Sequence, residues 1–250
     1  MKLDDIKKLH HKKYRSQFGQ YLVEGEHLVL ELQRAAQKQP ALHQSELLVT
    51  EAYADWQSPF RTEHISSKKM AQISDTKTPP GIVAVVPMAP VPVSKDSANI
   101  AIYLHEIQDP GNLGTILRTL AWFGGFRCLL SPGSVDPYNP KVVRASMGAI
   151  FHVPLELDVP ITGLADRFAR IASLDMAGHS ITEPGFQAVD CYVFGNEARG
   201  IPGAELEPLN ATAFTIPGAG VVESLNLASA VNLCVYERVR CPSARYSKPL

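Results

Sequence analysis

The chain has 250 residues, 45% of them hydrophobic, and a formal net charge of −1 at pH 7. This length and apolar content suffice for one large or two modest domains with a buried core. Because the whole chain is not a polycation, any binding to nucleic acid must come from a local basic patch.

Four widely spaced cysteines, Cys128, Cys191, Cys234 and Cys241, form no CxxC pair and have no cluster of histidines around them. This spacing predicts thiols in a reducing compartment and neither a disulfide framework nor a zinc site. No apolar run approaches the roughly 20 residues of a membrane-spanning helix. The N-terminus also lacks the apolar core of a secretory signal. We therefore expect a soluble cytoplasmic protein that binds no membrane and no metal.

The first 20 residues are locally basic, with six lysines and arginines against two aspartates. Two histidines and a tyrosine lie among these charges. Basic side chains gain affinity for RNA because they release counterions from its phosphates. We expect Lys12, Lys13 and Arg15 to contact RNA, although a solvated N-terminal helix explains the same charges equally well.

Alternating strand and helix patterns over residues 1–93 predict a small α/β domain. Strands are expected at residues 21–23, 47–50 and 82–86, and helices at 27–37, 52–57 and 66–73. Residues 86–97 are rich in proline and small residues, which predicts a stiff linker between two domains.

The second predicted domain, residues 98–250, alternates short apolar strands with helices, which indicates a mostly parallel sheet covered on both faces. Strands are expected at residues 100–105, 127–130, 153–157, 171–175, 191–194 and 213–216. Helices are expected from residue 112 to about 123 and at 141–149, 163–169 and 225–239.

The first strand of this domain leads through a tight turn into a helix. Asn112 occupies the position expected of the helix N-cap, where a side-chain oxygen accepts a backbone N–H. The apolar residues that follow share one helical face, and Arg118 projects away from it. Ligands of α/β proteins bind outside the carboxyl ends of strands. We therefore expect Arg118 to act on a substrate, with a solvated helix arginine as the alternative.

Two further glycine-containing loops follow apolar strands, GNEARGIPG at residues 195–203 and IPGAGVVESLN at residues 216–226. Their glycines allow backbone groups to approach a flat ligand closely. Neither loop contains GxGxxG or GxxxxGK[ST], which argues against a Rossmann site or a P-loop. Taken alone, each polar residue of these loops has an ordinary structural explanation. Glu197 can be an exposed loop acid, and Ser224 or Asn226 can be a helix N-cap. The sequence offers no catalytic triad and no carboxylate cluster for a metal.

Together, three segments resemble the ordered motifs of the SpoU/TrmH-type RNA ribose 2′-O-methyltransferases of the SPOUT class. They read DPGNLGTILRTLAWFG, VFGNEARGIP and IPGAGVVESLNLASAVNLCVYE. The segment YLVEGEHLVLE is similar to the start of the ribosomal-protein-like substrate-binding domain that often precedes this catalytic domain. The resemblance implies a C-terminal trefoil knot, a rare feature. It also implies a homodimer and a bent S-adenosyl-L-methionine held mostly by backbone groups.

The resemblance assigns roles to individual residues. The family's catalytic positions correspond to Asn112, Arg118, Glu197, Ser224 and Asn226. Its usual cofactor contacts correspond to Gly195, Ile216 and Leu225, and Leu174, at the end of another predicted strand, is expected to line the same pocket. Lys141 and Arg144, at i and i+3 of a predicted helix, join the basic N-terminus as expected RNA contacts, with surface charge an equal explanation for Arg144. The segment 218–220 departs from the family, because Gly-Ala-Gly stands where a bulkier residue is frequent.

The implied reaction is the attack of a ribose 2′-hydroxyl on the sulfonium methyl group. A hydroxyl is a poor nucleophile until its proton is withdrawn. Arg118 either positions a neighbouring phosphate and stabilises the developing alkoxide or, when desolvated, takes the proton. The first role is favoured because the pKa of a guanidinium lies above about 12.

The 2′-hydroxyl restricts the substrate to RNA. Ribosomal RNA is slightly favoured over transfer RNA, by analogy with the family. The alternative is an RNA-binding module of the same fold without catalysis, although such a binder has no reason to keep all five polar residues.

Overall fold

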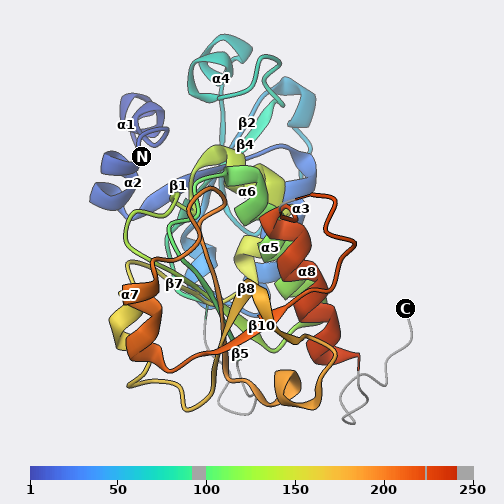
Figure 1. The fold of residues 1–250 in the computed structure, drawn as a ribbon. Helices are drawn as coiled ribbons and strands as arrows, with labels where there is room; N and C mark the ends of the chain where they lie inside the picture. The colour runs from blue at the N-terminus through green and yellow to red at the C-terminus, as the bar shows by residue number, and fades with distance from the viewer. Residues whose placement is uncertain (92–99, 223, 241–250) are drawn as a thin grey trace. The chain divides into compact units, whose positions relative to one another are not determined.

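The computed structural model describes residues 1–91, 100–222 and 224–240, and the chain divides into two compact units (Figure 1). Unit 1 consists of Met1–Val91 and Asp136–His152. Unit 2 contains the other described residues, 100–135 and 153–240. The chain therefore leaves unit 2 after Val135 and returns to it at Val153. The predicted boundaries at residues 93 and 98, with part of the predicted linker, lie outside the described residues.

Unit 1 is built on a four-stranded sheet with the order β1-β4-β2-β3. Its strands are β1 (Gln20–Glu24), β2 (Glu46–Val49), β3 (Arg61–His64) and β4 (Ile82–Pro87). Strand β4 is antiparallel to both neighbours, and β2 and β3 are parallel. The apolar run of β4 is buried, and Val83 and Val85 pack with Ile6 and Met70 in a core cluster on one face of the sheet. Sequence reasoning missed β3, because its residues are polar and mostly exposed.

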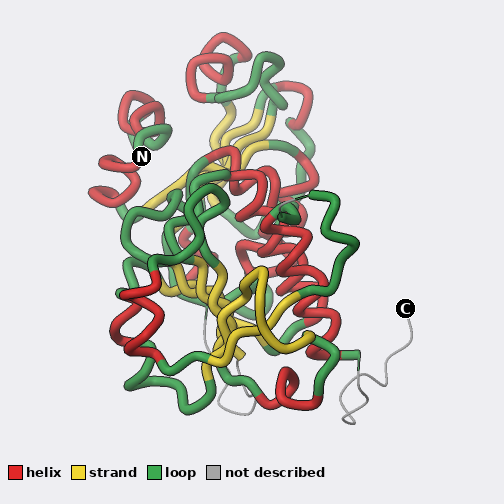
Figure 2. The backbone as a smooth tube through the Cα atoms, viewed as in Figure 1, coloured by secondary structure: helices red, strands yellow, loops and turns green. Residues whose placement is uncertain are grey.

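Short helices accompany this sheet (Figure 2). They are α1 (Leu3–Lys8), α2 (Lys12–Phe18), α3 (Glu26–Ala36), α4 (Ser67–Ile73) and α6 (Pro140–Ser146), with 3-10 turns at Pro40–Gln44, Glu51–Tyr53 and Ala149–Phe151. The helix expected at residues 52–57 is reduced to one of these turns. The helix expected at 141–149 ends early because Met147 and Gly148 both adopt a left-handed backbone, with φ of 49° and 92°.

Arg15 lies in the interior of unit 1 with only 3% of its surface exposed. Its Nε donates to Asp136 over 2.9 Å, and its Nη2 donates to the same carboxylate. Its Nη1 donates to the backbone oxygens of Leu9 and His10, each over 2.8 Å. The prediction that Arg15 contacts RNA is therefore wrong, because its guanidinium is buried and bonded to the protein itself.

The Arg15–Asp136 ion pair is expected to stabilise unit 1. We expect Arg15→Ala to lower the free energy of unfolding by about 3 kcal/mol, because it leaves the partly buried carboxylate of Asp136 without its partner. The matched control is Arg34→Ala, which removes the exposed pair with Glu31 and should cost less than about 1 kcal/mol. Urea unfolding of both variants measures the difference, and equal losses would contradict the prediction.

Unit 2 contains a six-stranded sheet with the order β10-β8-β9-β5-β6-β7. Its strands are β5 (Ile100–Leu104), β6 (Phe126–Leu130), β7 (Leu155–Glu156), β8 (Ile171–Ser180), β9 (Cys191–Phe194) and β10 (Thr212–Thr215). Every neighbouring pair is parallel. The predicted parallel α/β sheet is confirmed, and the trefoil knot stays a prediction.

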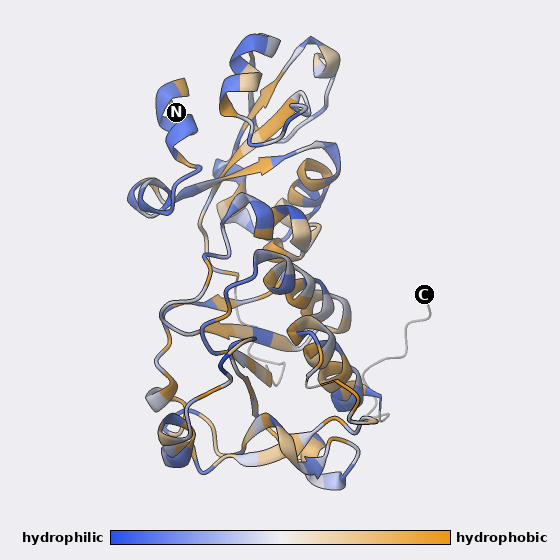
Figure 3. Cartoon of the chain, turned by 45° about the horizontal axis from the view of Figure 1, so that its top comes forward, coloured by the Kyte–Doolittle hydropathy of each residue, from blue (hydrophilic) through white to orange (hydrophobic). Residues whose placement is uncertain are grey.

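The helices of unit 2 are α5 (Pro110–Phe123), α7 (Gly203–Leu206) and α8 (Leu227–Val239), with 3-10 turns at Ile161–Gly163, Pro184–Ala188 and Glu207–Leu209. Helices α5 and α8 lie side by side (Figure 1). The strands carry mostly hydrophobic residues (Figure 3). Ala101 and Tyr103 pack with Leu164 and Phe168 in one core cluster. The helix expected at residues 163–169 is absent, because only one turn forms before the chain enters β8 at Ile171.

Three cysteines, Cys128, Cys191 and Cys234, are buried and free, whereas Cys241 lies outside the described residues. Burial raises the pKa of the Cys128 and Cys191 thiols to about 12, so both stay protonated near neutral pH. Within the described ranges, no helix is long and apolar enough to cross a membrane.

Candidate functional site

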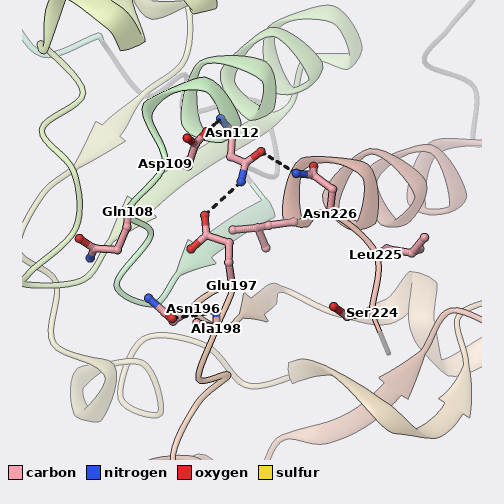
Figure 4. Close-up of a pocket in the computed structure, with 10 residues that line it drawn as sticks. Gln108, Asp109, Asn112, Asn196, Glu197, Ala198, Ser224, Leu225 and Asn226 are labelled. Carbon is pink, nitrogen blue, oxygen red and sulfur yellow. Dashed lines mark hydrogen bonds between the residues drawn. The ribbon is translucent and has the colours of Figure 1, made fainter. Parts of the chain in front are cut away.

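A hollow of about 450 Å³ lies beside the first turn of α5 (Figure 4). It is lined by Gln108, Asp109 and Asn112, by Asn196, Glu197 and Ala198, and by Ser224, Leu225, Asn226 and Leu227. Strands β5 and β9 are parallel neighbours, so the loops after their carboxyl ends meet at one edge of the sheet. The third group belongs to the segment that leads into α8. The three glycine-containing loops named in the sequence analysis therefore converge on one hollow.

The N-cap of helix α5 lies three residues earlier than the sequence predicts. Asp109 is its N-cap, and the Asp109 side chain accepts the backbone N–H of Asn112 over 2.7 Å. Pro110 occupies the first helical position, which tolerates proline because the backbone N–H there has no helical partner. The expectation that Asn112 caps the helix is wrong. Its side chain is instead free to enter the hollow.

Asn226, Asn112 and Glu197 form a chain of hydrogen bonds across the hollow (Figure 4). Asn226 is the N-cap of α8, and its Oδ1 accepts the backbone N–H of Ser229 over 3.2 Å. Its Nδ2 consequently faces Asn112 and donates to Oδ1 over 2.9 Å. Asn112 Nδ2 then donates to Glu197 Oε1 over 3.1 Å. The helix cap thereby sets the direction of both amides.

Asn196 ties the loop that carries Glu197 to the end of β5. Its Nδ2 donates to the backbone oxygen of Glu106 over 2.8 Å, and its Oδ1 accepts the N–H groups of the two residues after Glu197. Its backbone also pairs in both directions with Gly200. A Cβ on Gly195 would lie 2.6 Å from the carbonyl carbon of Gly200, so the fold-back of this loop requires glycine there.

Sequence reasoning missed Gln108, Asp109 and Asn196. Gln108 Nε2 donates to the backbone oxygens of Glu106 and Gly133, each over 2.9 Å, which orients this amide at the hollow. The dipeptide Asp-Pro was an available signal, because Asp is a common N-cap and Pro a common first helical residue. Asn196 gave the weaker signal of an Asn side chain bonding to backbone N–H groups two and three residues onward.

Asn112, Glu197, Ser224, Leu225 and Asn226 line the hollow, whereas the other four predicted catalytic and cofactor residues do not. Leu174 begins the stretch 174–178, where β8 leaves its ladder with β10. Gly195 follows β9, and Ile216 follows β10. Because β10, β8 and β9 are consecutive in the sheet, these three positions occupy one stretch of its edge.

Arg118 lies six residues beyond Asn112, about 9 Å along the axis of α5. It is exposed, and it has no hydrogen bond or ion pair with another described residue. Nearby, Trp122 of α5 is 71% exposed, and Leu233 and Tyr236 of α8 are also exposed. Thr119 joins the two helices through a hydrogen bond to Asn232. The adjacent helices α5 and α8 therefore carry exposed apolar side chains as well as Arg118.

The predicted RNA contacts all lie in unit 1. Lys12, Lys13 and Lys141 are exposed. Arg144 is half-buried and pairs with Asp75 over 3.3 Å, which reduces its availability to a phosphate. Within the described part of the chain, no group of three or more His, Cys, Asp or Glu could hold a metal ion.

Comparison with known proteins agrees with these features. The model of the SpoU rRNA methylase family matches residues 99–236, and that of an MRM3-like substrate-binding domain matches residues 2–84. The 23S rRNA (guanosine(2553)-2′-O)-methyltransferase RlmP of Bacillus subtilis is 31% identical, with 94% of each chain covered.

Two solved structures share the fold over 95% of this chain. A TrmH-family protein from Porphyromonas gingivalis is 30% identical, with a TM-score of 0.80 and 96% of that chain covered. An AdoMet-bound rRNA methyltransferase from Sinorhizobium meliloti is 24% identical, with a TM-score of 0.77 and 94% of that chain covered. With its three motifs converging on one hollow, the chain belongs to the SpoU rRNA methylase family.

Proposed function

We propose that this protein transfers a methyl group from S-adenosyl-L-methionine to a ribose 2′-hydroxyl of ribosomal RNA. The hydrogen-bonded chain of Asn226, Asn112 and Glu197 at the hollow carries this proposal. The similar Bacillus subtilis protein is named as an rRNA 2′-O-methyltransferase. An RNA-binding module without catalysis is not favoured, because such a module does not require three polar side chains connected across one hollow.

The stretch of the sheet edge that contains Leu174, Gly195 and Ile216 suits S-adenosyl-L-methionine. Ile216 and the stretch 218–222 make no hydrogen bond to other described residues, so their backbone groups are available to a ligand. Gly218 has open space where a side chain would stand. Leu174, Gly195, Ile216 and Leu225 would hold the cofactor there. When bound, it supplies the electrophilic methyl group.

The residues of the hollow align and polarise the ribose. Glu197 accepts from Asn112 through Oε1, which leaves Oε2 to accept a hydrogen bond from the ribose. The Ser224 hydroxyl lines the same hollow and has no partner among the described residues. Rate enhancement would come largely from alignment of the two reactants.

Arg118 acts, in this proposal, from a second copy of the chain. The same two helices expose Trp122, Leu233 and Tyr236, which suit an interface between α5 and α8 of two protomers. The partner's Arg118 would stabilise the negative charge that develops on the 2′-oxygen as its proton leaves to water. A guanidinium performs this role without losing its own proton.

Unit 1 would bind the RNA through phosphate contacts of Lys12, Lys13 and Lys141. Arg144 would also bind a phosphate, after leaving its ion pair with Asp75. The location of the protein in the cytoplasm remains a prediction of the sequence.

The function is tested by incubation with methyl-labelled S-adenosyl-L-methionine and unmodified ribosomal RNA, followed by digestion of the RNA to nucleosides. We expect label in 2′-O-methylated nucleosides. Absence of label in every RNA, together with no cofactor binding by calorimetry, would refute it.

A further inference from the structure

The lining of the hollow is acidic, although the proposed substrate is a polyanion. Of its ten lining residues, Asp109 and Glu197 carry negative charge and none carries positive charge. An RNA strand brings one phosphate per nucleotide, which these carboxylates repel. A cation at the rim of the hollow would offset this repulsion.

Arg199 directly follows the lining residue Ala198 and is 69% exposed. Its backbone N–H is fixed by Asn196 Oδ1 over 3.1 Å. Its Nη2 donates over 2.6 Å to Glu106, which lies two residues before the lining residue Gln108. Within the described ranges, the other N–H groups of the guanidinium have no acceptor. The ion pair with Glu106 thus orients the Arg199 guanidinium, whose other N–H groups remain available to a ligand.

Glu106 holds Arg199 from a strained position. Its φ of 48° is left-handed, a conformation that glycine adopts without penalty and other residues adopt at a cost. Its backbone N–H donates to Ser131 Oγ, and its backbone oxygen accepts from Asn196 and Gln108. A glycine could make all of these contacts. Only the contact between the Glu106 carboxylate and Arg199 therefore depends on a glutamate side chain at this position.

We propose that Arg199, oriented by Glu106, binds a phosphodiester group of the RNA substrate at the rim of the hollow. A guanidinium suits this ligand because its planar fork offers paired, charge-assisted hydrogen bonds. Because Glu106 already restrains the side chain, less conformational entropy is lost when the phosphate binds. The inference rests on the proposed function for the identity of the RNA.

The test measures binding of an unmodified large-subunit rRNA transcript by fluorescence anisotropy over a series of salt concentrations. We expect Arg199→Ala to raise the Kd for this RNA by about tenfold or more. The slope of log Kd against log salt should become shallower by about one, as for one lost phosphate contact. Arg199→Lys should keep the slope and lose part of the affinity. Glu106→Gly should weaken binding less than Arg199→Ala.

Arg170→Ala is the matched control, because Arg170 forms a similarly exposed ion pair with Asp190 in the same unit, over 2.8 Å. It should leave both RNA affinity and slope unchanged. The inference is overturned if Arg199→Ala behaves like this control, or if it weakens cofactor binding as much as RNA binding. RNA binding is measured without turnover, so a wild-type protein that binds RNA but methylates none would refute the proposed function alone.

Discussion

Replacement of Arg118 by alanine is expected to reduce methyl transfer by about a thousandfold while the affinity for S-adenosyl-L-methionine stays unchanged. Loss of one group that stabilises developing oxyanion charge has an effect of this order. Arg118 does not line the hollow of its own chain, so its removal leaves that hollow intact. Single-turnover transfer to rRNA and calorimetry with the cofactor measure the two quantities separately.

Mixing two inactive variants tests whether Arg118 acts across a dimer. Arg118→Ala is combined with Asn112→Ala, unfolded together and refolded so that the protomers pair at random. If the partner supplies Arg118, half of the dimers are mixed and each has one complete site, which restores about a quarter of the wild-type activity. If Arg118 serves its own chain, no mixed dimer has a complete site. Absence of recovery in dimers verified by light scattering would contradict the proposal.

The charge-preserving variant Arg118→Lys separates the effect of the positive charge from that of the planar guanidinium. Lysine keeps the positive charge but lacks the planar fork, so we expect partial activity. A variant that loses transfer and cofactor affinity together would mean that Arg118 supports the fold of the pocket. A variant that is inactive only because it is monomeric would assign Arg118 to the interface alone.

The second large effect is expected for Asn226→Asp, with a loss of about a hundredfold in kcat and little loss of stability. Aspartate is as good an N-cap as asparagine, so α8 keeps the bond from the Ser229 N–H. The second carboxylate oxygen, however, would face Asn112 Oδ1, which is also an acceptor. Asn112 must then turn its amide and withdraw its donor from Glu197. Thermal unfolding and initial rates measure the two consequences.

Asn226→Ala is the counterpart to this variant. It removes the cap, so it should cost about 1 kcal/mol of stability, and it leaves Asn112 without repulsion. We expect Asn226→Ala to be the less stable variant and Asn226→Asp the less active one. The opposite ranking of activities would show that Asn226 serves only the helix.

The strands of unit 2 were predictable because a buried parallel strand leaves a short, continuous apolar run between turns. This signal located β5, β6 and β9 within a residue. It failed for β3, which is polar because much of it is exposed. Helical spacing was misleading at residues 163–169, because Leu164 and Phe168 are four residues apart but only one turn separates the 3-10 helix from β8.

The site was predictable where its residues belong to the three short sequence motifs. The motifs identified five of the ten residues that line the hollow, but not Gln108, Asp109 or Asn196, and not how the side chains bond. The donor order from Asn226 through Asn112 to Glu197 depends on which residues cap α5 and α8. Arg15 shows the limit of charge patterns, because an arginine within a basic run bonds to Asp136, which is 121 residues away in the sequence.

The passage of Asp136–His152 into unit 1 alters what a cut in the chain would do. Cleavage within residues 92–99 severs one covalent connection and leaves the two crossings at 135–136 and 152–153. The N-terminal fragment then lacks both helix α6 and the carboxylate that pairs with Arg15. Unit 1 is thus assembled from both fragments, so a nicked protein would hold together by complementation. Residues 1–91 are therefore one part of unit 1, and Asp136–His152 are the other.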